Sequence, residues 1–146
     1  YARGRQELLA DRPELALPAL TRALVAWQPY AGHAYVARRI ADAQLAAGEA
    51  ELALGRAALA VPPLEQALAA HTGQQARTLL SRPRRAAAEA RVALAQALWA
   101  TGDAPATRQR ARTLLAEAEA FYREVGDQPR LDAIAGWRTE HGAASP

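Results

Sequence analysis

The chain repeats its own sequence after 44 residues, and this repeat restricts the folds open to it more than any other feature. Shifting the sequence by that distance aligns these residues, among others, with identical ones: Gly4, Glu7, Leu8, Arg12, Leu15, Ala16, Pro18, Leu20, Ala23 and Leu24. A third copy is visible when Gly102 is aligned with Gly55 and four residues are inserted after it. Ala111, Leu115 and Ala118 then take the places of Ala60, Leu64 and Ala67. Repetition on this scale predicts stacked helical hairpins.

The composition favours an all-α fold. Hydrophobic residues make up 51% of the chain, and they are largely Ala, which is the best helix former and lets helices approach closely. The length of 146 residues is that of one domain with a hydrophobic core of its own. We therefore expect a single all-α domain over residues 1–146.

Four predicted helix starts share one pattern, a residue that can cap a helix followed two positions later by proline: Asp11 and Pro13, Ser81 and Pro83, Asp103 and Pro105, Asp127 and Pro129. The side chain of the first residue would cap the first turn of the helix. Proline fits in this turn because the N–H groups there have no partner within the helix, so its missing N–H costs nothing. Together with the apolar spacing, these starts predict helices over 1–10, 12–27, 33–54, 58–71, 82–101, 106–125 and 129–140, with a short helical turn at 74–80. Thr72-Gly73 is expected to end the helix 58–71. Pro18 and Pro62-Pro63 either delay the start of their helices or kink them.

The repeated residues resemble a known family. Gly55, Ala60, Leu64 and Ala67, with Leu45 and Gly48 before them, are similar to the small–large signature of a tetratricopeptide repeat. The copy that runs from Leu94 to Ala118, followed by Tyr122 and a Trp137 helix, resembles the C-terminal repeat arrays of large bacterial signalling proteins, notably eukaryotic-like serine/threonine kinases. The spacings of 44 and then 51 residues replace the usual 34, and Glu7 and Glu51 stand where the family has a large apolar residue, so we interpret the repeats as variant ones.

The resemblance implies a right-handed α-α superhelix of antiparallel helical hairpins, a TPR-like solenoid. Its repeats would cover about 1–27, 33–71 and 82–125, and the helix 129–140 would cap the array. In such arrays the first helix of each hairpin lines a concave binding face. By position, the groove-facing residues are Asp42, Leu45, Glu49 and Leu52 in the middle copy, and Glu89, Val92, Gln96 and Trp99 in the last. For Trp99 the alternative is packing against the terminal helix near Trp137, since large aromatic side chains are mostly buried.

Arginine is the only basic residue type besides histidine, and five arginines cluster in the middle of the chain: Arg77, Arg82, Arg84, Arg85 and Arg91. Arg84 and Arg85 are the candidates for docking an acidic or phosphorylated segment. The alternative is a solvated helix face with local partners such as Glu89. No stacking aromatic residue interrupts the cluster, so we expect no nucleic-acid binding.

No catalytic or metal-binding set is recognisable. The chain has no cysteine, and His33, His71 and His141 are isolated residues that we expect at the surface, so we predict no metal, no cofactor and no enzyme activity. No apolar run approaches the roughly 20 residues of a membrane span, and no signal-peptide layout is present, so we expect a cytoplasmic protein without membrane contact. The chain opens on Tyr1, not Met, which we read as part of a longer protein.

These observations favour a non-catalytic scaffold that binds a partner protein or peptide through its helical repeats. Two alternatives remain open at this point. The first is self-association into a homo-oligomer through an apolar end of the array. The second is a regulatory or sensor region of a serine/threonine kinase whose catalytic domain lies outside these residues.

Overall fold

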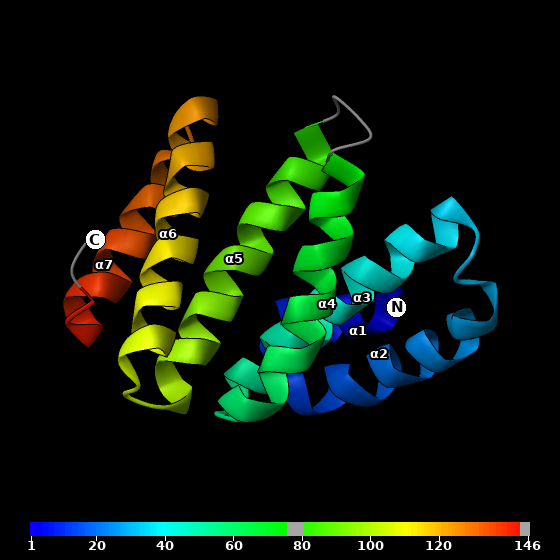
Figure 1. The fold of residues 1–146 in the computed structure, drawn as a ribbon. Helices are drawn as coiled ribbons and strands as arrows, with labels where there is room; N and C mark the ends of the chain where they lie inside the picture. Colours follow the sequence, from blue (N-terminus) through cyan, green and yellow to red (C-terminus); the bar gives the residue numbers. More distant parts are fainter. Residues whose placement is uncertain (76–80, 144–146) are drawn as a thin grey trace.

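The protein is all-α, as its sequence predicts. The computed structural model describes residues 1–75 and 81–143, and within these ranges it contains helices and no strand (Figure 1). The elements are α1 (Ala2–Leu9), α2 (Pro13–Trp27), the 3-10 turn η1 (Gln28–Tyr30), α3 (Ala34–Ala53), α4 (Ala57–Gln75), α5 (Ser81–Thr101), α6 (Pro105–Val125) and α7 (Gln128–His141).

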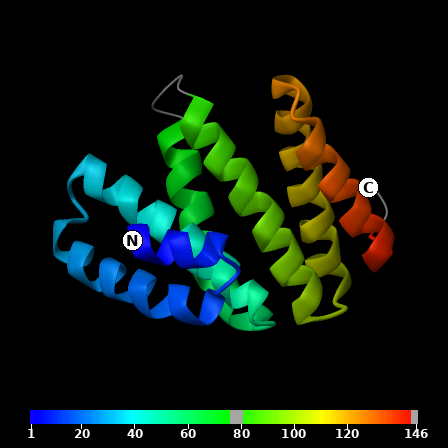
Figure 2. The same cartoon turned by 180° about the vertical axis from the view of Figure 1, so that it is seen from behind.

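Each α-helix packs against the next one along the chain. Helices α4, α5, α6 and α7 follow one another across the molecule toward the red C-terminal end, and α1, α2 and α3 lie on the other side of α4 (Figures 1 and 2). One hydrophobic cluster joins α1, α2 and α3 around Ala16, Leu20 and Ala46. A larger cluster extends from α3 to α7 and includes Leu64, Leu94 and Leu115. Alanine supplies much of both clusters, because its small side chain allows close helix packing.

The 44-residue repeat of the sequence recurs in the helix contacts. Gly4 on α1 lies so close to α2 that an added Cβ would stand 2.6 Å from Leu20 Cγ. Gly48 on α3 meets Leu64 of α4 in the same way. Both leucines are fully buried, and both pairs are separated by 16 residues. A side chain at either glycine would push the two helices of its hairpin apart.

The turns within these two hairpins also match. Asp11 and Gly55, which are 44 residues apart, both have positive φ (55° and 70°), and the next residue in each turn donates its backbone N–H back to a glutamate carbonyl. The same glutamates pair through their side chains: Arg12 Nε lies 2.8 Å from Glu7, and Arg56 Nη1 lies 3.7 Å from Glu51. Charged residues at these two positions thus hold the turn, where the resemblance led us to expect apolar ones.

The capping pattern locates the helix starts but is wrong about two of the caps. Helices α2 and α6 begin at their prolines, so Arg12 and Ala104 are the N-cap residues and neither helix has a side-chain cap hydrogen bond. Asp11 and Asp103 lie one residue too early to reach the first turn. Only in α7 is the expected cap formed, where Asp127 accepts a hydrogen bond from the backbone N–H of Arg130. The described part of α5 begins at Ser81, whose side chain lies outside the described residues.

Two further expectations concern helix interruption. The predicted end at Thr72-Gly73 is wrong, because α4 continues to Gln75; an exposed glycine costs a helix only about 1 kcal/mol, which packing against α5 offsets. The short turn expected at 74–80 falls mainly on 76–80, outside the described residues. Pro18 and Pro62 lie inside their helices, so neither proline starts its helix. A proline has no N–H to donate to the carbonyl four residues earlier, which belongs to Glu14 and to Ala58. These residues are exposed, so water can solvate their carbonyls.

Gly48→Ala tests the close helix contact. We expect it to lower the free energy of unfolding by about 1–3 kcal/mol, because the buried Leu64 side chain has no room to move away. The matched control is Gly136→Ala, an exposed position in α7 where an added Cβ meets nothing within 4 Å. Its helix propensity should raise the stability by about 0.5–1 kcal/mol. Urea unfolding followed by circular dichroism measures both, and equal effects at the two sites would contradict the contact.

Candidate functional site

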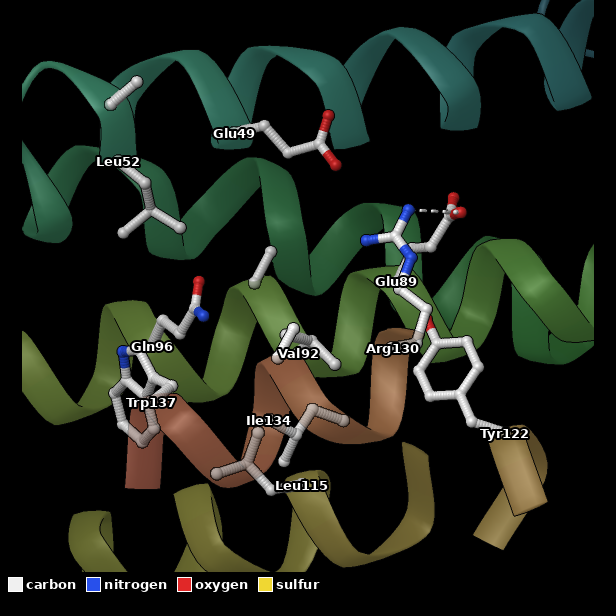
Figure 3. Close-up of a pocket in the computed structure, with 13 residues that line it drawn as sticks. Glu49, Leu52, Glu89, Val92, Gln96, Leu115, Tyr122, Arg130, Ile134 and Trp137 are labelled. Atoms are coloured by element: carbon white, nitrogen blue, oxygen red, sulfur yellow. Dashed lines mark ion pairs between the residues drawn. The ribbon is translucent and has the colours of Figure 1, made fainter. Parts of the chain in front are cut away.

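A cavity of about 450 Å³ lies between α3, α5, α6 and α7 (Figure 3). Its volume is in the range of ligand pockets in proteins. The residues that line it come from four helices: Glu49, Leu52 and Ala53 on α3; Glu89, Val92, Ala93 and Gln96 on α5; Leu115 and Tyr122 on α6; and Arg130, Ala133, Ile134 and Trp137 on α7.

The cavity has an apolar end and a polar end. Leu52 and Trp137 lie at the apolar end with Gln96 beside them, and Val92 and Ile134 form the middle of the wall (Figure 3). Glu49, Glu89, Arg130 and Tyr122 gather at the polar end. An elongated ligand with one charged and one apolar part would match this division.

Glu49 is a carboxylate held where burial disfavours its charge. It comes from α3, one residue after the glycine that packs on α4, and its side chain is only 33% exposed. Burial raises its pKa above the ordinary value, and the nearby charge of Glu89 raises it further. Arg5 on α1, whose Nη1 lies 3.2 Å from Glu49, and Arg130 on α7 oppose this shift. Burial outweighs both cations.

Arg130 projects from the first turn of α7 to the same end of the cavity. The Asp127 cap holds this turn by accepting the backbone N–H of Arg130 at 3.3 Å. The Arg130 guanidinium pairs with Glu89 of α5 at 3.5 Å, and its own side chain is 54% exposed. The pair is long and its arginine is more than half exposed, so it contributes little to stability.

Tyr122 brings an unused hydroxyl to the cavity. The residue is 1% exposed, and its hydroxyl, which points toward Arg130 and Glu89 in Figure 3, has no hydrogen-bond partner among the described residues. Leaving a buried polar group unpaired costs about 1–3 kcal/mol. Burial raises the pKa of Tyr122 to about 12, so at neutral pH the side chain is an uncharged phenol that can both donate and accept a hydrogen bond.

Four of the eight residues that the sequence singled out meet at this cavity: Glu49, Leu52, Glu89 and Gln96. Val92, named with them by position, lines it as well, whereas Leu45 is buried in the core. The first helices of two successive hairpins therefore face one space.

The structure places Asp42 elsewhere. Its carboxylate lies 3.6 Å from His71 Nε2, between α3 and α4, and His71 is 1% exposed. The expected surface position of His71 is therefore wrong: the residue lies one turn before the end of α4, on the face that packs inward. His33 and His141 are exposed, as predicted.

Trp99 does not line the cavity and instead packs edge-on against Trp137, with ring centroids 5.8 Å apart, as the alternative interpretation held. The guanidinium of Arg108 covers its ring, 3.8 Å from the centroid. Trp99 is therefore engaged within the chain on two sides, by α6 and by α7.

The described arginines of the cluster all have acidic partners. Arg84 pairs with Glu124, Arg85 lies 2.7 Å from Asp127, and Arg91 lies 2.7 Å from Glu117. Glu117 and Glu124 on α6 and Asp127 before α7 balance the positive charge of these arginines, which favours the solvated-face interpretation. Arg77 and the side chain of Arg82 lie outside the described residues.

Among the lining residues that the sequence did not single out as site residues are Tyr122, Arg130, Ile134 and Trp137. A signal for the last three was present, because positions 130, 134 and 137 share one face of a helix. Tyr122 carries no such signal, because nothing in the sequence distinguishes an unpaired hydroxyl from a paired one.

Comparison with known proteins finds no matching family model, no similar curated protein and no similar solved structure. Within residues 1–75 and 81–143, no group of three or more His, Asp or Glu side chains could hold a metal ion, and no helix in that part of the chain is long and apolar enough to cross a bilayer. The fold and the cavity define the class: an all-α protein of consecutively packed helices with an amphipathic cavity between four of them.

The raised pKa of Glu49 predicts a pH-dependent effect of Glu49→Gln. The folded protein holds the Glu49 proton more tightly than the unfolded chain, so stability is lost as the pH rises above the ordinary glutamate value. Glu49→Gln removes this loss and should raise the free energy of unfolding at about pH 7, with the gain shrinking toward about pH 4. Urea unfolding at both pH values measures the difference.

Glu124→Gln is the matched control, because the ion pair with Arg84 lowers the pKa of Glu124. This carboxylate contributes stability above its ordinary pKa, so its replacement should not stabilise the protein at neutral pH. A Glu49→Gln variant less stable than the parent at neutral pH would mean that the Arg5 pair outweighs burial.

Proposed function

We propose that this chain is a non-catalytic interaction scaffold that binds a segment of a partner protein in the cavity between α3, α5, α6 and α7. One observation carries the proposal: positions expected to face a groove on the first helices of two successive hairpins line a single cavity. A peptide lying there would contact four helices at once.

The arrangement that we propose for the chain is a variant TPR-like right-handed superhelix with α7 as its cap. The repeated glycine–leucine contacts and the matching turns of the first two hairpins support it. The resemblance of the sequence to repeat arrays of bacterial signalling proteins supports a place in a larger cytoplasmic signalling protein, with catalysis outside these residues.

The composition of the cavity favours a peptide. Apolar side chains cover most of its wall, and Trp137 is a half-buried aromatic residue of the kind that anchors interfaces. The polar groups lie at one end, where they can orient a bound chain. Tyr122 stays protonated at neutral pH, and both glutamates face arginines, so these groups favour recognition over proton transfer.

Filling the cavity tests the proposal. Ala133 is an exposed residue of α7 that lines the cavity, whereas Ala135, two residues further on, is exposed and does not line it. Peptides would be selected on the 146-residue chain from a random peptide library, and their affinities measured by fluorescence anisotropy. We expect Ala133→Trp to weaken binding by about tenfold or more, because the new side chain fills the space in which an anchor residue of the peptide would be buried. Ala135→Trp should leave binding unchanged.

Light scattering over a concentration series is measured on the same samples. A concentration-independent monomer that binds the selected peptides supports the scaffold function. A dimer that Ala133→Trp disrupts would replace the proposal with self-association through the cavity. Equal peptide binding by the two tryptophan variants, or no selected peptide, would overturn it.

A further inference from the structure

We propose that the polar end of the cavity recognises a basic side chain, Lys or Arg, of the bound peptide, with a bulky apolar residue of the same peptide at the end formed by Leu52 and Trp137. This inference rests on the proposed function and specifies the chemistry of the partner. In the structure described here, Arg130 of the chain itself stands where that basic side chain would lie.

Hydrogen-bond acceptors meet at the polar end from three helices. Glu49 comes from α3, Glu89 from α5 and the Tyr122 hydroxyl from α6. The described lining contains these two carboxylates and one cation, Arg130; Arg5, which is not part of the lining, pairs with Glu49 at 3.2 Å. Because ammonium and guanidinium groups donate several hydrogen bonds in different directions, they suit such a set of acceptors, whereas an acidic ligand would face two carboxylates.

The Tyr122 hydroxyl supplies an independent observation that points to a ligand. It is buried, it points toward this end of the cavity, and no described residue pairs with it. A basic side chain of a partner would donate to its oxygen, which the long Arg130–Glu89 pair leaves unused. The hydroxyl oxygen of Tyr122 can therefore accept a hydrogen bond from a donor that enters the cavity.

Arg130 shows that a guanidinium fits this end, and its attachment makes it replaceable. It is carried by α7, of which only Ile134 is buried between its caps, and its side chain is more than half exposed. Displacing Arg130 from Glu89 would therefore cost little. A basic side chain of the partner would replace Arg130 as the ion-pair partner of Glu89, and it would also donate hydrogen bonds to Glu49 and to the Tyr122 hydroxyl.

The experiment reads residue preferences in the selected peptides and repeats the selection with variants. The probe is a library of acetylated, amidated random octapeptides displayed to the 146-residue chain. We expect enrichment of peptides that contain Lys or Arg together with a bulky apolar residue. For the Glu49→Gln/Glu89→Gln double variant, the affinity of those peptides should fall by about tenfold or more, because charge-assisted hydrogen bonds are lost. Glu65→Gln/Glu117→Gln, which changes charge equally away from the cavity, should bind like the parent.

Tyr122→Phe separates recognition from structural support. Removing an unpaired buried hydroxyl should leave thermal stability equal or higher, while the affinity for the basic peptides falls by about threefold to tenfold. A residue needed only for folding would lose stability instead. Loss of stability with unchanged affinity per folded molecule would overturn the role of Tyr122 in recognition.

Arg130→Ala should strengthen binding of the basic peptides by about threefold to fivefold, because the chain's own guanidinium no longer competes. Arg110→Ala, which removes an equal charge paired with Glu65 elsewhere, controls for long-range attraction. Peptides that bind in the cavity without any basic preference, or weaker binding by Arg130→Ala, would overturn this inference and leave the scaffold function standing. Selection of no peptide at all would remove both.

Discussion

The close approach of α3 to α4 at Gly48 is the contact on which the site depends. Because Gly48 has no side chain, Leu64 packs directly against the α3 backbone. The next residue, Glu49, and then Leu52 line the cavity. A larger residue at 48 would move α3 away from α4 and change the distance of Glu49 from α5. The same contact at Gly4 and Leu20 places α1, and with it Arg5, next to Glu49.

Two groups at the polar end of the cavity lower the stability of the protein. Burial opposes the charge on Glu49, and the Tyr122 hydroxyl is left without a partner among the described residues. An apolar residue of the same size would be less costly at either place, and under the proposed function these groups are kept for recognition of the bound peptide. The arginine pairs on α5 and α6 differ from them, because they are exposed and mutually balanced.

Much of the fold could be predicted because it depends on local rules. Proline near a helix start, glycine at the end of α3 and the spacing of alanine and leucine locate the helices to within a few residues. The errors arise where packing decides. His71 is buried because the last turns of α4 face α3. Helix α4 continues through the exposed Gly73 because one glycine costs a helix only about 1 kcal/mol. The resemblance to repeat arrays placed Glu49, Leu52, Glu89 and Gln96 on one face, whereas it did not indicate that α7 contributes to the cavity.

By itself, the sequence determined the helical class, the repeat and the places where the chain turns, because helix propensity, proline, glycine and a 44-residue match act within short stretches of chain. Only the tertiary structure decided which charges stand together. Glu49, Glu89, Tyr122 and Arg130 are far apart in sequence and meet because four helices converge, and burial then shifts the pKa of Glu49 and Tyr122. Desolvation and unpaired hydrogen bonds are properties of an assembled environment, so the residues' identities alone do not specify them.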